Sequence, residues 1–138
     1  MSNHELLDSE GYPTQHALET IEKWDYMDPY GLIDFLEPIW WAPDWGIKKS
    51  DGVDICNRPV LKFELHTGGW SGNEDIVRSL IKNYFWGFYW QMSKRGGHYY
   101  FEIPTKERLY GAQKENKELQ TFQAKQGENQ ADGSSAEG

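Results

Sequence analysis

The chain has 138 residues, and its seven Trp, eight Tyr and six Phe can supply the core of one domain. Its one cysteine, Cys56, excludes an internal disulfide and is typical of a reducing compartment. The N-terminal segment is too polar for a signal peptide, and no apolar run reaches the ~18 residues of a membrane helix. We therefore expect a cytoplasmic protein that does not enter the membrane.

Charge is distributed unevenly along the chain, whose formal total is −8. Residues 1–46 hold ten acidic residues and one lysine, whereas residues 47–110 hold ten basic and seven acidic residues. Either the two segments pack beside each other, or the acidic one is a surface for a basic partner such as an enzyme that acts on nucleic acid. The negative total argues against nucleic acid as a direct ligand.

Two helices are predicted in the acidic segment. The first spans residues 15–25, where apolar residues recur on one face: Ala17, Leu18, Ile21 and Trp24. The second begins at Pro29, with Asp28 as its N-cap, and continues to about Glu37, where Pro38 limits it. Its buried residues should be Leu32, Ile33, Phe35 and Leu36.

The middle of the chain should form the first two strands of a sheet. A short strand is expected around residues 45–49, followed by a loop over residues 50–57. Residues 59–66 alternate between apolar and polar side chains, which predicts a half-buried strand. Three tryptophans should line the seam between the helices and the sheet: Trp40, Trp41 and Trp45.

A third helix is predicted over residues 72–84, with a buried stripe at helical spacing: Ile76, Val77, Leu80, Ile81 and Tyr84. The aromatic runs at residues 85–92 and 98–103 are predicted as the two strands of a hairpin, whose turn contains Gly96 and Gly97.

These elements predict an α+β fold with a mainly antiparallel sheet in the order β-β-α-β-β and with N-terminal helices. We expect a single domain over residues 1–110. Residues 111–138 are rich in polar side chains, and we expect them to form a disordered tail.

A glycine-rich loop connects the strand at 59–66 to the third helix in the sequence HTGGWSGNED, residues 66–75. Ser71 and Glu74 have the spacing of a capping box, so Ser71 is predicted to cap the helix. Free N–H groups at a helix N-terminus attract anions, although the loop has neither the Walker nor the dinucleotide-binding glycine spacing. The loop is either a tight connection with a packed Trp70 or a site that recognises a small anion or a partner.

Two histidines end up at neighbouring strand ends in this arrangement. His66 closes one predicted strand and His98 opens another, and both should lie near Glu74. Such a group could bind a metal or transfer protons, but the sequence lacks an HExxH motif, and a hydrogen-bonded structural pair is the simpler interpretation.

The hairpin turn adds two basic side chains, Lys94 and Arg95, that either face solvent or touch an acidic partner. The predicted binding site combines the loop with this turn and consists of His66, Thr67, Trp70, Ser71, Asn73, Glu74, Arg95 and His98. We expect no catalytic residue, metal ligand or cofactor among them.

Three motifs of the second half are TGGWSGNE, FWGFYW and RGGHYYF. In these motifs the chain resembles a small family of uncharacterised bacteriophage and prophage proteins. The resemblance implies an accessory protein that acts in the cytoplasm of a bacterial host. It implies no activity, cofactor or catalytic residue.

We therefore expect a small, non-enzymatic accessory protein that binds a host or phage macromolecule, with a protein as its partner. One alternative is an anion- or nucleotide-binding domain, or a small enzyme, that uses residues 67–74. Another is an acidic inhibitor of a nucleic-acid enzyme. The sequence leaves the identity of the partner and the oligomeric state open.

Overall fold

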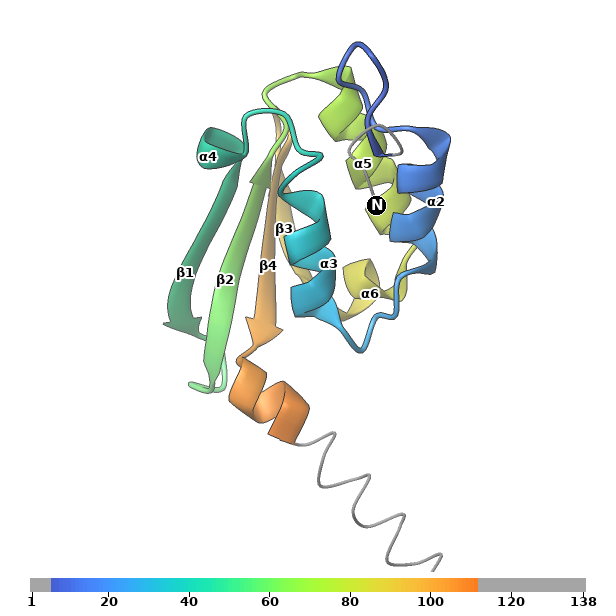
Figure 1. Cartoon of the computed structure of the whole chain (residues 1–138). Coiled ribbons are helices and arrows are strands. Elements are labelled where there is room, and N and C mark those ends of the chain that lie inside the picture. Colours follow the sequence, from blue (N-terminus) through green and yellow to red (C-terminus); the bar gives the residue numbers. More distant parts are fainter. Residues whose placement is uncertain (1–5, 112–138) are drawn as a thin grey trace, which may run out of the picture. The chain divides into compact units, whose positions relative to one another are not determined.

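The computed structural model describes residues 6–111 and confirms the α+β fold (Figure 1). The elements are α2 (Gln15–Lys23), α3 (Pro29–Leu36), α4 (Pro43–Gly46), β1 (Ile47–Val53), β2 (Pro59–His66), α5 (Ser71–Ile81), α6 (Tyr84–Tyr89), β3 (Trp90–Lys94) and β4 (His98–Pro104). The chain divides into two compact units, Met1–Ile103 and Pro104–Gly138. The first contains nearly all of these elements. The predicted tail, apart from Gly111, lies outside the described residues.

Four strands form one antiparallel sheet in the order β1-β2-β4-β3. Strands β1 and β2 pair along their whole length, so that Ser50 lies opposite Lys62. In the second hairpin Met92 lies opposite Tyr100, and the register shifts between Trp90 and Met92. Because β2 and β4 are central neighbours, the ends of two segments far apart in the sequence meet there.

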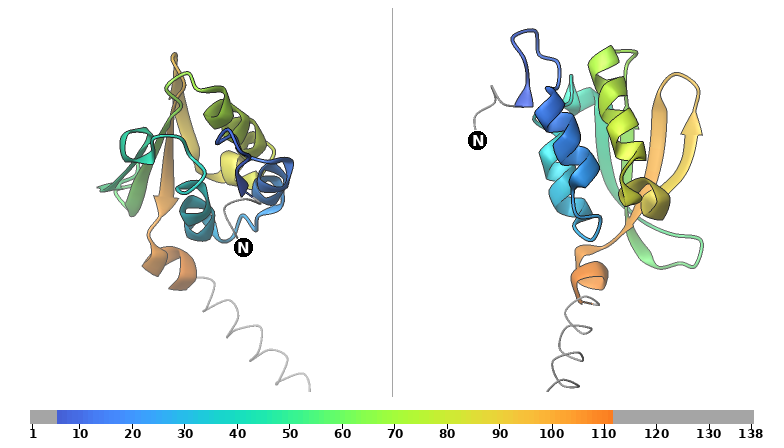
Figure 2. Two further views of the ribbon diagram at one scale, coloured as in Figure 1. Left: turned by 45° about the horizontal axis from the view of Figure 1, so that its top comes forward. Right: turned by 90° about the vertical axis from the view of Figure 1, so that its right-hand side faces the viewer.

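The four longer helices cover one face of the sheet, as Figures 1 and 2 show, and the core lies between these two layers. An aromatic contact links the layers, because the ring centroids of Phe85 in α6 and Phe101 in β4 are 5.5 Å apart. Within the sheet, the ring centroids of Phe101 and Phe63 of β2 are 5.6 Å apart. Other fully buried side chains include Ile21, Leu32, Leu36, Leu65, Ile76, Leu80 and Ile103. Along residues 6–111, no helix is long and apolar enough to cross a membrane.

The two N-terminal helices begin where capping chemistry predicts. The Thr14 side chain accepts a hydrogen bond from the Ala17 N–H, and Asp28 accepts one from the Gly31 N–H. Pro29 then occupies the first turn of α3, where its missing N–H is not needed. The predicted starts of both helices are therefore confirmed.

The prediction of a strand over residues 85–92 is wrong in its first half, because Tyr84–Tyr89 form helix α6. The Asn83 side chain caps this helix by accepting from the Phe85 N–H (2.7 Å). Its amide also donates to the backbone oxygens of Ile21 (2.9 Å) and Trp24 (2.8 Å) at the end of α2. Two features therefore override the β propensity of the aromatic run: Asn83 is a buried cap, and Phe85 and Tyr89 are buried one helical turn apart.

The first strand is longer than predicted, because residues 50–53 belong to β1 and only the following residues form a turn. Asp54 organises that turn by accepting hydrogen bonds from the N–H groups of Arg58 (3.0 Å) and Cys56 (2.9 Å). The Arg58 N–H is the main reason why the pKa of Asp54 lies below its ordinary value.

Several side chains predicted to be buried face solvent instead. The exposed fraction is 52% for Ile81 and 74% for Tyr84, because α5 ends at Ile81 and the chain turns before α6 begins. Trp40 is buried as predicted, but Trp41 and Trp45 are half exposed. Trp45 belongs to α4 and Trp41 lies just before it, and α4 lies at the end of β1 apart from the other labelled helices (Figure 1).

We predict that Leu80→Ala lowers the free energy of unfolding by about 2–5 kcal/mol, because Leu80 is fully buried in α5 and its truncation leaves a cavity. The matched control is Ile81→Ala, the next residue, which should change stability by less than about 1 kcal/mol. Urea denaturation measures both. Equal losses for the two variants would contradict the orientation of α5.

Candidate functional site

The glycine-rich loop is held against the β3–β4 hairpin. Gly68 and Gly69 both have positive φ angles (63° and 75°), which turn the chain sharply after β2. The Thr67 N–H donates to the Gly97 carbonyl (2.9 Å), and a side chain at Gly97 would collide with that of Thr67. The sequence motifs TGGWSGNE and RGGHYYF therefore meet in space.

Asn73 connects this loop to the segment before α4. Its side-chain oxygen accepts from the Trp41 N–H (2.8 Å), and its amide donates to the backbone oxygens of Trp41 (3.1 Å) and Thr67 (3.2 Å). The side chain is fully buried. Asn73 and Thr67, both part of the predicted binding site, are buried, and their side chains make hydrogen bonds to backbone groups of the loop.

The prediction that Ser71 caps α5 is wrong. Ser71 is the first residue of the helix, Trp70 occupies the N-cap position, and no side-chain hydrogen bond caps the helix. The Glu74 N–H makes an ordinary helical bond to the Trp70 carbonyl (3.1 Å). The boundary shifts by one residue because the Trp70 backbone is still extended, while its ring covers Gly72, where any side chain would collide with it.

Trp70 lies in the middle of an aromatic stack. Its ring centroid is 4.8 Å from that of Tyr12 and 5.9 Å from that of Trp41. The side chain is half-buried, between the two predicted extremes of core residue and exposed tip.

Trp41 and Trp45 flank the exposed Gly68, and we call these three residues the tryptophan surface. Their exposed fractions are 52% for Trp41 and 51% for Trp45. A Cβ atom added at Gly68 would lie 3.1 Å from the Trp45 ring and 3.7 Å from the Trp41 ring. The bare glycine backbone therefore forms the floor between two indoles.

The two histidines beside this surface form a hydrogen-bonded pair, as the strand ends predicted. The Nδ1 atoms of His66 and His98 are 2.7 Å apart. The carboxylate partner is Glu64, whose Oε1 lies 3.0 Å from His66 Nε2, and not Glu74. Glu64 and His66 are two residues apart in β2 and so project from the same face of the sheet.

One arrangement of protons satisfies both contacts, and it depends on the tautomer of each ring. When His66 Nε2–H donates to Glu64 and the ring is neutral, His66 Nδ1 accepts the Nδ1–H of His98. The second nitrogen of His98 then carries a lone pair and can accept a proton. Within residues 6–111, no three His, Cys, Asp or Glu side chains are grouped so that they could hold a metal ion.

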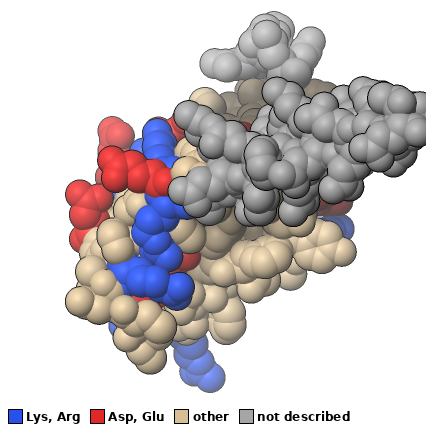
Figure 3. Space-filling model, turned by 90° about the horizontal axis from the view of Figure 1, so that it is seen from below, with Lys and Arg blue, Asp and Glu red and all other residues tan. Residues whose placement is uncertain are grey.

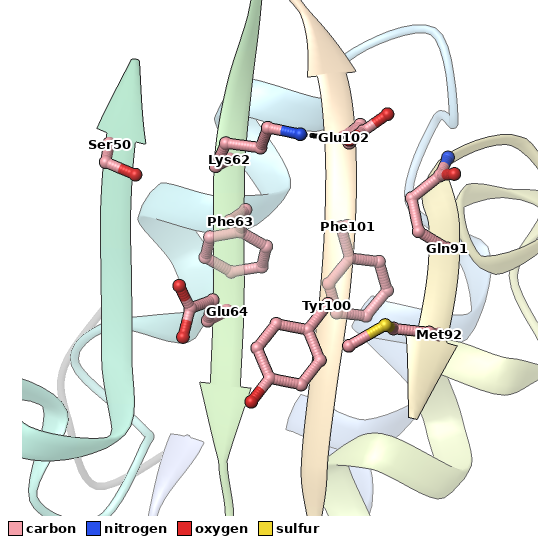
Figure 4. Close-up of a pocket in the computed structure, with 9 residues that line it drawn as sticks. All are labelled: Ser50, Lys62, Phe63, Glu64, Gln91, Met92, Tyr100, Phe101 and Glu102. Atoms are coloured by element: carbon pink, nitrogen blue, oxygen red, sulfur yellow. Dashed lines mark hydrogen bonds and ion pairs between the residues drawn. The ribbon is translucent and has the colours of Figure 1, made fainter. Parts of the chain in front are cut away.

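The uncovered face of the sheet continues from the histidines into a shallow hollow of about 280 Å³ (Figure 4). Lys62 and Glu102 form an ion pair across β2 and β4 at one side of it. Tyr100 lines the other side, 6.0 Å from His66 between ring centroids, and the Lys94 amine lies 5.5 Å from the Tyr100 ring. The hollow therefore combines three aromatic rings, those of Phe63, Tyr100 and Phe101, with the paired charges of Lys62 and Glu102.

Ion pairs join the acidic N-terminal segment to the basic one, which supports the interpretation that the two segments pack beside each other. Glu37 pairs with Lys49, and Glu22 lies 3.8 Å from Lys82. Figure 3 likewise shows Lys and Arg side chains next to acidic and uncharged ones. Such exposed pairs add little stability.

Arg95 is exposed in the hairpin turn, as predicted.

Comparison of the chain with protein-family models, with curated proteins and with solved structures gave no match.

Sequence reasoning missed Glu64 and the exposure of Trp41 and Trp45. The alternation of residues 59–66 did contain a signal for Glu64, because it places that side chain and His66 on one face. Exposure of a tryptophan depends on which elements cover it, and no local pattern reports that.

We predict that Asn73→Ala destabilises the protein by about 1–3 kcal/mol, because it leaves buried backbone groups of Trp41 and Thr67 without their hydrogen-bond partner. Ser71→Ala, two residues away and exposed, should stay within about 0.5 kcal/mol of the parent because no cap is lost. Thermal or urea unfolding measures both variants. A larger loss for Ser71→Ala than for Asn73→Ala would restore the capping prediction.

Proposed function

We propose that this protein is a non-enzymatic binding protein that recognises a protein partner through the tryptophan surface. The observation that carries the proposal is the half exposure of Trp41 and Trp45 on either side of Gly68. Tryptophan is usually well buried in a monomer, and it is the residue type most enriched among those that dominate binding energy at interfaces.

The rigidity of the surface supports this proposal. Asn73 holds the Trp41 backbone by two hydrogen bonds, and Trp70 stacks on its ring. The Trp45 ring lies against Gly68 and 6.1 Å from the His66 ring centroid. Side chains that are already ordered lose little conformational entropy when a partner binds, so more of the contact energy becomes affinity.

The phage resemblance suggests where such a protein would work. Its motifs TGGWSGNE and RGGHYYF border the tryptophan surface, where Thr67 bonds to Gly97 and His66 to His98. On this basis we propose an accessory protein of a bacteriophage or prophage that binds a host or phage protein in the host cytoplasm.

A small enzyme is the second candidate, and the Glu64–His66–His98 chain is the observation that favours it. A carboxylate that orients an imidazole is a common arrangement for general-base catalysis. Anion binding by the loop itself has less support, because the N–H groups of Gly69 and Trp70 already donate to Thr67. The third candidate, an acidic inhibitor, is weakened by the pairing of Glu22 and Glu37 with lysines.

We predict that Trp41→Ala and Trp45→Ala each weaken partner binding by about 2 kcal/mol or more, roughly 30-fold in Kd, because each removes an exposed anchor. The matched control is Phe88→Ala, which removes an exposed aromatic (61%) from α6 at the other end of the layer of helices. The full-length chain is used to isolate its partner from a bacterial lysate, and calorimetry then measures each variant.

Both tryptophan variants should keep the melting temperature of the parent within a few degrees, since neither side chain is in the core. If both tryptophan variants bind the partner with unchanged affinity and Phe88→Ala loses affinity, the interface lies at α6 and not at the tryptophan surface. If the parent turns over a substrate and the Glu64→Gln variant does not, the result favours the enzyme instead.

A further inference from the structure

The His66–His98 contact joins two nitrogens of the same kind. With the Nδ1 atoms 2.7 Å apart, only one hydrogen fits between them. One ring must therefore donate and the other accept, and the contact depends on how many protons the pair carries.

The number of protons on the two rings determines whether the contact between them persists. In the neutral pair, one proton lies between the two Nδ1 atoms and another lies between His66 and Glu64. A third proton can bind the free nitrogen of His98 without disturbing the contact, which then becomes a stronger, charge-assisted hydrogen bond. A fourth proton must occupy the remaining Nδ1, so two N–H groups would point at each other and the rings must separate.

The charged groups around the pair act in opposite directions on these steps. Glu64 of β2 favours the first added proton on the pair. Lys94 of β3, opposite His98 in the hairpin and over the Tyr100 ring of β4, opposes additional positive charge. Lys48 of β1 lies opposite Glu64 in the strand register. From α4, which also carries Asp44, the Trp45 ring lies 6.1 Å from the His66 ring between centroids.

The pair also fastens the elements that form the tryptophan surface. The backbone hydrogen bond from the Thr67 N–H to the Gly97 carbonyl joins the two residues that are next to these histidines in sequence. Gly68, the floor of the surface, is two residues from His66, and the Trp45 ring lies beside the His66 ring. Separation of the imidazoles would therefore loosen the loop from the hairpin and displace the floor between the indoles.

We infer that the His66–His98 pair is a pH-dependent latch: it holds the tryptophan surface in its binding shape until both imidazoles are protonated, and it then releases the loop. The inference rests on the proposed function only for its biological meaning, because the latch is a property of the free protein.

The test follows the free, full-length protein by NMR from about pH 8 down to about pH 5, the range in which histidine side chains gain protons. Imidazole ¹⁵N signals report when both rings are charged. At that point the Gly68, Gly97 and Trp45 indole signals should shift together. The protection factor of the Thr67 amide hydrogen, which compares its exchange with the intrinsic rate at the same pH, should fall at least 10-fold.

The matched variant is His98→Asn, whose side chain cannot become a cation. Its NH2 group can donate to the neutral His66 Nδ1, and after an amide flip its oxygen can accept from the protonated His66 Nδ1–H. Its loop signals should stay constant over the same range, and its melting temperature should fall less on acidification than that of the parent. The melting temperature of the parent should fall on acidification because two Nδ1–H groups then face each other and the contact between the rings breaks. His66→Asn is the equivalent variant if His98→Asn does not fold.

Fully protonated histidines with unchanged loop signals in the parent would overturn the latch, as would a variant whose loop responds to pH as the parent does. Partner affinity measured at the two ends of the pH range separates this result from the proposed function. A latch that opens while affinity stays constant would contradict the tryptophan surface as the interface and leave the latch intact. Loss of affinity on acidification in the parent but not in the variant supports both.

Discussion

The buried amide of Asn73 is the interaction on which the site depends. It joins three parts of the chain that are distant in sequence: helix α5, the loop after β2 and the segment that leads into α4. Because the segment at Trp41 has no regular secondary structure, its backbone groups need such a partner when they are buried. Without this bridge, Trp41 and Gly68 would have no fixed relation to each other, and the tryptophan surface would not exist as a shape.

The sheet order supplies the second constraint. With β2 and β4 adjacent, the ends of two motifs separated by some thirty residues form a histidine pair and a backbone bond between Thr67 and Gly97. A second group of exposed aromatics lies at α6, where Tyr26 stacks on Phe88 (5.2 Å) and meets the edge of Tyr84 (5.5 Å), although Phe88 and Tyr84 stay 61% and 74% exposed. The tryptophan surface instead combines fixed indoles with a bare backbone and a group that binds protons.

Local chemistry predicted much of the fold. The alternation of residues 59–66 identified β2, and Asp28 followed by Pro29 identified the start of α3, because both signals act within a few residues. Helix α6 could not be predicted in this way, since its start depends on Asn83 bonding to the end of α2. The proximity of His66 and His98 followed from strand ends. Their carboxylate partner did not, because choosing Glu64 over Glu74 requires knowing which side chains share the sheet face.

We propose that a partner binds at the tryptophan surface beside the His66–His98 pair, and hydrogen–deuterium exchange of the isolated complex tests this most directly. Compared with the free protein, peptides that cover residues 41–46, 66–70 and 96–98 should exchange more slowly in the complex. The peptide that covers α6, with its exposed Tyr84 and Phe88, should be unchanged and serves as the internal reference. Protection of α6 with no change in the three site segments would contradict the account.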